Sequence, residues 1–301
     1  MLEKKYDFKK VKIKYAPITR NNKIEINNML NIKQPNIGCA AWGWREVEIP
    51  EYFQWANNHG ISLVEINAHP GAPKHLLHDG DEESVAKIAA WAKEAGVEVV
   101  CIAGRNNFTI PEEAALEQEI KRVQRFVDFA RQLGAKFVRL LSGSHRTDNV
   151  APEVFTRLHY AFNRLGDYAQ QRDIKITIEN HGGPTATGQR IVKIMEGVKS
   201  PAVGLNFDPA NFLNQGTDPL MALRYTLPWI NYSHWKDVRW ENGSPQFCAF
   251  GEGEIVWEPI IEELLSSGYQ GYWLVEYEEP SDIELGTKKS LDNLSKLLKK
   301  F

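Results

Sequence analysis

The sequence has little cysteine, no long apolar run and almost no net charge. Its three cysteines, Cys39, Cys101 and Cys248, form no CxxC pair. An odd number of widely spaced cysteines predicts reduced thiols in the cytoplasm and not a disulfide framework. No apolar run approaches the ~18 residues of a membrane-spanning helix. The formal net charge of −3 gives no global field that would attract nucleic acid or an anionic membrane, so neither is expected as a partner.

What the sequence does contain is the composition of an ordinary globular chain. The 43% of hydrophobic and 25% of charged residues are typical of a protein with a packed core, and 301 residues is a common length for one barrel domain. Residues 1–35 differ from the rest. Apolar and basic residues alternate over 10–15, and Ile24 and Ile26 alternate in a similar way in a second run. This alternation predicts an appended N-terminal β-hairpin over 1–35, with a mobile basic tail as the alternative.

From residue 36 the pattern becomes regular, with eight short apolar runs rich in β-branched or aromatic residues. They lie at 36–42, 62–67, 97–103, 136–142, 174–179, 202–207, 230–235 and 272–277. Helical stretches separate them; in the clearest, Thr109 and Glu112 suggest a capping box and Gly134 a C-terminal stop. Eight strands alternating with helices predict an α/β fold, a (β/α)8 TIM barrel over 36–301. An open, doubly wound parallel sheet is the alternative.

Four consecutive predicted strands end in residues that can bind a metal ion. Glu179 ends the fifth run, Asp208 follows the sixth, His234 lies on the seventh and Glu276 ends the eighth. In a barrel, side chains at the C-terminal strand ends face one axis. Three carboxylates at one place repel each other unless a cation lies between them. Three oxygen donors and one imidazole suit Mn²⁺ best, with Mg²⁺ or Co²⁺ as alternatives and Zn²⁺ less typical.

The segments around these four residues, IENHGG, FDPAN and HWKD, resemble the xylose isomerase-like TIM barrels. That superfamily contains sugar isomerases, epimerases, inosose dehydratases and an apurinic endonuclease, and the resemblance covers about residues 36–301. It implies that the four residues bind one metal ion and that Glu179 and Glu276 also transfer protons. A metal that binds a substrate oxygen acidifies the adjacent C–H bond, and a carboxylate can remove that proton. Return of a proton gives isomerisation or epimerisation, and loss of hydroxide gives dehydration.

The sequence departs from the ketose 3-epimerases of this superfamily at two places. Those enzymes carry a histidine three residues after the sixth-strand aspartate, where this chain has Asn211, here a candidate substrate-binding residue. They also carry a glutamate shortly after the fifth-strand ligand, where this chain has Gly-Gly-Pro-Thr. HWKD is similar to the HxKD motif of the inosose dehydratase and related sugar-acting branches. The similarity implies that Lys236 binds a substrate hydroxyl or carbonyl; a Lys236–Asp237 ion pair on the loop is the alternative.

Five further residues at the predicted barrel mouth are candidates for the site. His181 is expected to contact substrate, to act as an acid, or to orient a carboxylate. His69 and His145 are expected to bind substrate or to form loop hydrogen bonds. Arg239 is a candidate for neutralising an anionic substrate, with a surface ion pair as the alternative. Trp42 is expected to pack against sugar C–H groups or to anchor its loop.

These observations leave four functions open. The first is a metal-dependent isomerase or epimerase of a small sugar or keto-sugar. The second is a metal-dependent lyase that dehydrates an inosose-like ketone or eliminates from a 3-keto-glycoside. An apurinic endonuclease-like phosphoesterase is remote, because it needs further metal ligands that the strand ends do not supply. The fourth is a sugar-binding barrel without activity. The expected partner is a small carbohydrate, and the sequence leaves a homo-oligomer open.

Overall fold

The computed structural model describes residues 35–76, 80–143 and 149–301. The hairpin predicted over residues 1–35 therefore falls outside the described residues except for Pro35, and so does His145. The chain divides after Gln34, and the unit Pro35–Phe301 contains everything that follows.

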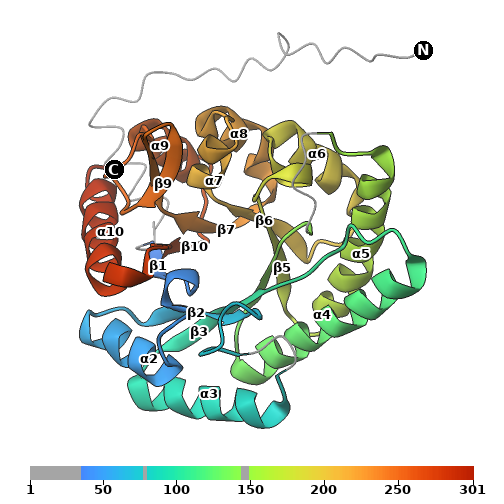
Figure 1. Ribbon diagram of the computed structural model, residues 1–301, viewed down its shortest axis with the longest axis horizontal. Coiled ribbons are helices and arrows are strands. Elements are labelled where there is room, and N and C mark those ends of the chain that lie inside the picture. Colours follow the sequence, from blue (N-terminus) through green and yellow to red (C-terminus); the bar gives the residue numbers. More distant parts are fainter. Residues whose placement is uncertain (1–34, 77–79, 144–148) are drawn as a thin grey trace. The chain divides into compact units, whose positions relative to one another are not determined.

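Eight parallel strands of this unit close into a barrel and follow one another around it in chain order (Figure 1). Each of the eight predicted apolar runs overlaps one of them, so the (β/α)8 prediction is confirmed and the open sheet is excluded. The strands are β1 (Asn36–Cys39), β2 (Leu63–Ala68), β3 (Glu98–Gly104), β4 (Phe137–Leu140), β5 (Lys175–Glu179), β6 (Val203–Phe207), β7 (Ile230–Trp235) and β10 (Tyr272–Val275).

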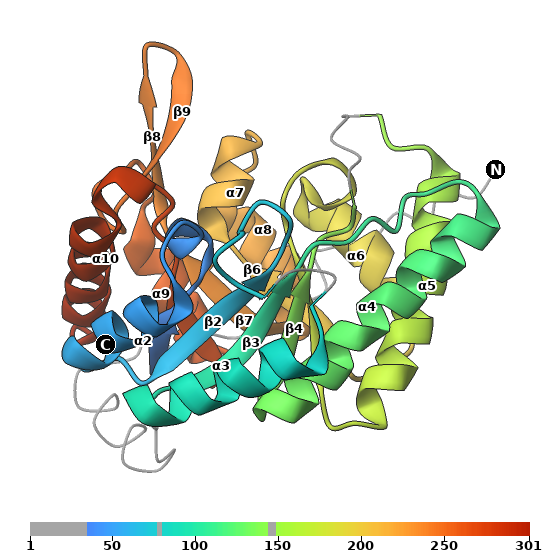
Figure 2. The ribbon, with the colours of Figure 1, turned by 60° about the horizontal axis from the view of Figure 1, so that its bottom comes forward.

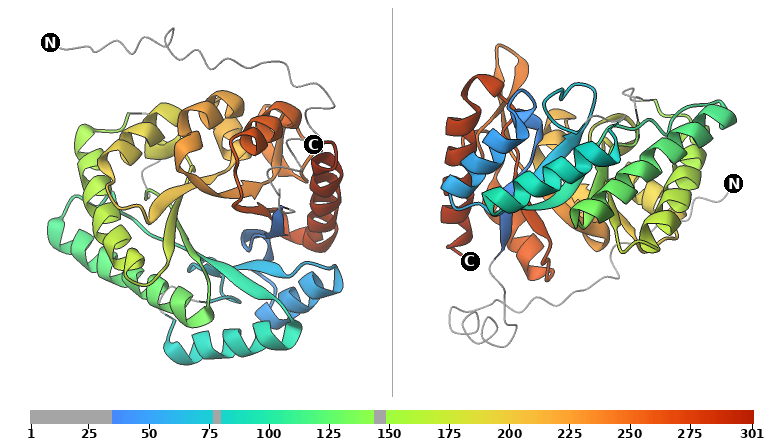
Figure 3. Two further views of the ribbon diagram at one scale, coloured as in Figure 1. Left: turned by 180° about the vertical axis from the view of Figure 1, so that it is seen from behind. Right: turned by 90° about the horizontal axis from the view of Figure 1, so that it is seen from below.

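Helices between the strands form a ring outside the barrel, which Figure 3 shows from two further sides. The α-helices are α2 (Ile49–Asn58), α3 (Glu82–Ala95), α4 (Glu113–Leu133), α5 (Pro152–Gln170), α6 (Gly188–Gly197), α7 (Pro209–Asn214), α8 (Pro219–Thr226), α9 (Trp257–Ser266) and α10 (Ile283–Leu298). Short 3₁₀ turns are η2 (Trp42–Trp44), η3 (Gly183–Thr185), η4 (Leu227–Trp229) and η5 (Pro280–Asp282). Within the described residues, no helix is long and apolar enough to cross a membrane.

The longest of these helices, α4, shows which local signals were reliable. Gly134 ends it with a positive φ of 76°, as predicted, because glycine adopts this left-handed conformation without a steric cost. The predicted capping box is wrong. The helix begins after Glu112, whose side chain makes no cap, and Thr109 instead donates its hydroxyl to Asn107.

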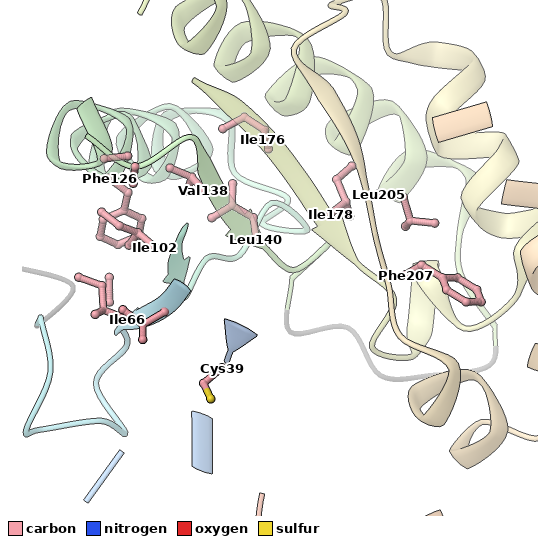
Figure 4. Packing of buried hydrophobic residues seen from close by; sticks show 14 of the residues in the cluster. Cys39, Ile66, Ile102, Phe126, Val138, Leu140, Ile176, Ile178, Leu205 and Phe207 are labelled. Atoms are coloured by element: carbon pink, nitrogen blue, oxygen red, sulfur yellow. The ribbon is translucent and has the colours of Figure 1, made fainter. Parts of the chain in front are cut away.

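Most of the core lies between the strands and the helices (Figure 4). Alternate strand residues point outward into it. The strand residues labelled there are Cys39, Ile66, Ile102, Val138, Leu140, Ile176, Ile178, Leu205 and Phe207. A second, smaller cluster contains Cys101, Phe137, Tyr232 and Leu274, which come from the intervening strand positions. Because strand side chains alternate, this second cluster fills the barrel interior.

A two-stranded antiparallel hairpin, absent from the predicted pattern, interrupts the regular βα order after β7. It consists of β8 (Asp237–Glu241) and β9 (Ser244–Cys248), which pair only with each other. Figure 2 shows it standing out from the end of the barrel at which β7 ends. Asn242 and Gly243 form its turn with φ values of 52° and 79°, the positive angles that a tight hairpin turn requires.

Candidate metal centre

The four residues at the ends of β5, β6, β7 and β10 come together at the barrel mouth. Glu179, Asp208, His234 and Glu276 each offer one ligand atom, and these atoms all lie within 4.8 Å of one another. All four side chains are buried. The four strands are consecutive neighbours in the barrel, so parallel strand direction alone brings their C-terminal ends to one place.

The imidazole of His234 is the clearest test of whether a metal ion fits this group. Its Nδ1 atom lies 3.4 Å from an oxygen of Glu179 and 3.4 Å from an oxygen of Glu276, yet it has no hydrogen-bond partner among the residues that the structure describes. Burial alone would lower the pKa of His234, but the surrounding carboxylates, Glu276 foremost, hold that pKa well above its usual value. A buried nitrogen that faces two carboxylates without a hydrogen bond, beside a third carboxylate, is a donor set that fits a divalent cation.

Two further side chains hold the carboxylates in place. The guanidinium of Arg139 on β4 lies 3.2 Å from Glu179, from Nε to Oε2. The Asn211 amide donates to Glu179 Oε1 at 3.2 Å and to Asp208 Oδ2 at 3.0 Å. Burial alone would raise the pKa of Glu179. The positive charge of Arg139 outweighs this effect and lowers the pKa to about 2. Burial dominates at Asp208 and raises its pKa to about 6, although Lys236 opposes the rise.

The side chain of Lys236 extends into the same group of carboxylates. Its buried ammonium lies 2.8 Å from Asp208 Oδ2 and 2.5 Å from Glu278 Oε1, and it also bonds to Glu276. Burial would lower the pKa of Lys236, but these carboxylates hold it well above its usual value. The Phe247 ring of the hairpin covers the ammonium, 4.8 Å from the ring centroid.

The neighbouring residue Asp237 turns the other way, so the predicted alternative of a Lys236–Asp237 pair does not occur. Its carboxylate accepts hydrogen bonds from the backbone of Val238 at 2.9 Å and of Ile255 at 3.3 Å, and from the Trp257 indole at 2.8 Å. The HWKD segment thus places His234 and Lys236 in the site and fixes the root of the hairpin through Asp237.

Sequence reasoning missed two charged residues inside the barrel, Glu65 on β2 and Arg139 on β4. Both are buried. Glu65 Oε2 lies 3.3 Å from His234 Nε2, on the side of the imidazole away from the other carboxylates. The only sequence signal for either residue is a charge in the middle of an otherwise apolar run, SLVEIN and KFVRLLS. A buried charge needs a partner, but the sequence does not say which one.

Comparison with known proteins identifies the family of this chain. The family model of the xylose isomerase-like TIM barrel matches residues 53–297. The chain belongs to this family. An inosose dehydratase from Lacticaseibacillus casei is 26% identical over 300 residues, which cover 85% of this chain and 96% of that protein.

Two solved structures have the same fold. The IOLI protein with a bound zinc atom matches with a TM-score of 0.74 at 17% identity, covering 88% of this chain and 99% of that one. An L-ribulose 3-epimerase matches with a TM-score of 0.73 at 15% identity, covering 89% of this chain and 95% of that one. At these identities the two structures establish only that this chain shares their fold.

The other predicted site residues occupy different places in this xylose isomerase-like barrel. The rings of Trp42 and His69 meet edge to face, with centroids 4.8 Å apart. His181 is half-buried directly after β5, and its backbone N–H donates to Thr185 Oγ1 at 2.9 Å. Arg239 lies on the exposed part of β8 and pairs with Glu241 at 2.7 Å, the surface ion pair named as the alternative.

Proposed function

We propose that this chain is a divalent-metal-dependent enzyme that dehydrates a small keto-sugar or inosose-like ketone. One observation carries the proposal: the buried group of Glu179, Asp208, His234 and Glu276 with the Lys236 ammonium beside it. Mn²⁺ is the ion we propose, because three carboxylates and one imidazole suit it; Mg²⁺, Co²⁺ and Zn²⁺ are the alternatives. Glu179, Asp208, His234 and Glu276 would hold the ion.

The ion, when bound, supplies a Lewis acid that polarises a substrate oxygen and acidifies the neighbouring C–H bond. The residues of the chain do the rest. Glu179 or Glu276 accepts the C–H proton, and the electron pair moves toward the carbonyl. The electron pair then returns and forms a C=C bond to the neighbouring carbon, which is β to the carbonyl. The C–O bond of the hydroxyl on that β carbon breaks at the same time, while Lys236 donates a hydrogen bond to the departing oxygen. The carboxyl returns its proton to that oxygen, so one water leaves and neither an oxidant nor a reductant is needed.

Two observations favour dehydration over epimerisation. The likeness to an inosose dehydratase extends over 85% of this chain. In addition, Asn211 stands where the ketose 3-epimerases have a histidine. Its amide donates to Glu179 and Asp208, so this position supplies an amide that orients carboxylates and no imidazole for substrate.

Isomerisation or epimerisation of a small sugar is the second candidate. Glu179 Oε1 and Glu276 Oε1 lie at the same distance, 3.4 Å, from His234 Nδ1. Two carboxylates arranged in this way are suited to remove a proton and to return one. The two reactions share the first proton transfer and differ in whether carbon is reprotonated or hydroxide leaves.

Incubation of metal-loaded protein with a panel of inososes and ketoses in D₂O distinguishes the candidates. Dehydration gives a product lighter by one water, whereas isomerisation or epimerisation gives a product of unchanged composition that carries solvent deuterium. Lys236→Met should abolish water loss while C–H exchange persists. Arg224→Met, which removes an exposed cation of α8 that pairs with Glu263, should change neither. Metal-loaded protein that catalyses neither exchange nor water loss on any member of the panel would contradict the proposal.

A further inference from the structure

Glu65 is a buried carboxylate that the proposed reaction does not use. It lies in the middle of β2 with no exposed surface. Its Oε2 atom lies 3.4 Å from the Tyr232 hydroxyl and 3.3 Å from His234 Nε2, and its Oε1 atom accepts from the Ala41 backbone N–H at 3.4 Å. These contacts are long for a fully buried carboxylate, and the buried guanidinium of Arg139 also interacts with it electrostatically. Apolar packing alone does not account for a buried carboxylate at this position.

The two nitrogens of His234 have different surroundings. Nε2 lies 3.3 Å from Glu65 Oε2. A hydrogen on Nε2 lets the ring donate to this oxygen, which gives both buried atoms a hydrogen-bond partner. An imidazole that binds a metal ion is neutral and has only one N–H, so its Nδ1 then carries the lone pair. Within the described residues Nδ1 has no hydrogen-bond partner, and it lies 3.4 Å from both the Glu179 and the Glu276 carboxylates. A lone pair directed at two carboxylate oxygens is stable only with a cation between them.

We infer that Glu65 is a positioning residue that fixes His234 as the Nε2–H tautomer and so makes Nδ1 the metal-binding atom. The inference rests on the metal site of the proposed function. The negative charge of Glu65 also increases the electron density on the imidazole, which strengthens its bond to a divalent ion. Glu65 and His234 are 169 residues apart in the sequence, and only closure of the barrel brings β2 opposite β7.

Two substitutions of Glu65 separate orientation from charge. Glu65→Gln keeps the shape and an oxygen that accepts from Nε2–H but removes the charge. Glu65→Leu removes both. We expect the affinity for Co²⁺ or Zn²⁺, measured by titration of the metal-free protein, to fall about 10-fold in Glu65→Gln and about 100-fold in Glu65→Leu. Glu119→Gln is the matched control. It removes a partly buried carboxylate on α4 that pairs with Arg122, and its metal affinity should equal that of the wild type.

The tautomer can be read without any substitution. In ¹⁵N-histidine-labelled wild-type protein loaded with Zn²⁺, long-range ¹H–¹⁵N correlation should show His234 with its hydrogen on Nε2 and the metal on Nδ1. A hydrogen on Nδ1, or wild-type metal affinity in Glu65→Leu, would overturn the inference. This spectrum decides the matter even if Glu65→Leu does not fold. Neither measurement involves a carbohydrate, so failure of the proposed reaction leaves both results standing and the two failures remain distinguishable.

Discussion

The two ends of the barrel interior differ in what fills them. At the end where the strands finish, Glu179, Asp208, His234, Lys236 and Glu276 are buried together with their charges. Toward the other end the filling is aromatic. There the ring of Phe137 lies 5.0 Å from that of Tyr232 and 5.6 Å from that of Tyr272, between centroids.

One end of the barrel thus contributes mainly to the stability of the fold, and the other holds the groups that bind the proposed metal ion. Aromatic packing stabilises the barrel through buried apolar area, and such packing requires no ligand. The charged end is stable only through pairing, because each buried carboxylate lies against Lys236, Arg139, Asn211 or the ion we propose. Substitutions at the charged end should therefore change metal binding and rate, and substitutions at the aromatic end should change the free energy of unfolding.

The largest expected effect is on the rate. Glu179→Gln and Glu276→Gln keep the shape and one oxygen donor but remove the base. Each should lower kcat about 10²–10⁴-fold, the usual contribution of general acid–base catalysis, with metal content measured in parallel. Glu241→Gln, which removes an exposed carboxylate of the hairpin, is the control. A Glu179→Gln protein that keeps its metal and near-full solvent exchange would show that this glutamate is a ligand and not the base.

At the aromatic end we expect the opposite result. Phe137→Ala removes the ring between Tyr232 and Tyr272 and should lower the free energy of unfolding by about 3–5 kcal/mol, measured by denaturant titration of the metal-free protein. Its affinity for Mn²⁺ should stay at the wild-type value. A tenfold loss of metal affinity would show that the two ends are coupled, so that stability and metal binding depend on the same residues.

Removal of the metal tests the charged end as a whole. Binding to the folded state alone stabilises a protein by about 2.7 kcal/mol when the ligand is present at 100 times its dissociation constant. We therefore expect a chelator to lower Tm by several degrees and excess Mn²⁺ to restore it. In Asp208→Asn, which loses one ligand, the difference between the two Tm values should be smaller than in the wild type. Equal Tm values with and without metal in the wild type would contradict the site.

The smallest expected effect is the dependence of metal affinity on pH. Burial raises the pKa of Asp208 to about 6, so this carboxyl is protonated below that value and ionised above it. Metal binding at lower pH must displace this proton. Affinity for Mn²⁺ should therefore fall about tenfold per unit as pH decreases below about 6, and it should be level with respect to Asp208 above it. In Asp208→Asn this step should disappear, and its persistence would assign the proton to another group.

How much of this could be predicted from the sequence depended on the distance between partners. The eight strands and the four candidate ligands were predicted because a short apolar run and the residue that ends it are adjacent in the chain. Glu65 and Arg139 were missed, since their partners His234 and Glu179 lie on other strands and no local pattern joins them. The capping box failed for a local reason, because the Thr109 hydroxyl donates to Asn107, only two residues away.

The hairpin was missed although its signal was present. Asn242–Gly243 is the strongest short-range indication of a tight β-turn, and the flanking residues of β8 and β9 contain aromatic and apolar side chains. The regular alternation of strands and helices predicts only a helix after β7. An insertion between β7 and α9 does not disturb that period, so only the turn residues could have revealed it.

The separate pairing of this hairpin has a consequence for how the protein can change over evolutionary time. The strands β8 and β9 form no ladder with the barrel, and Asp237 fixes the root from outside the metal group. The part of the hairpin beyond Asp237 can therefore lengthen, shorten or be exchanged without moving His234 or Lys236. Phe247 places this replaceable segment over the Lys236 ammonium. Related chains are thus free to diverge in the molecules they accept while the chemistry beneath stays the same.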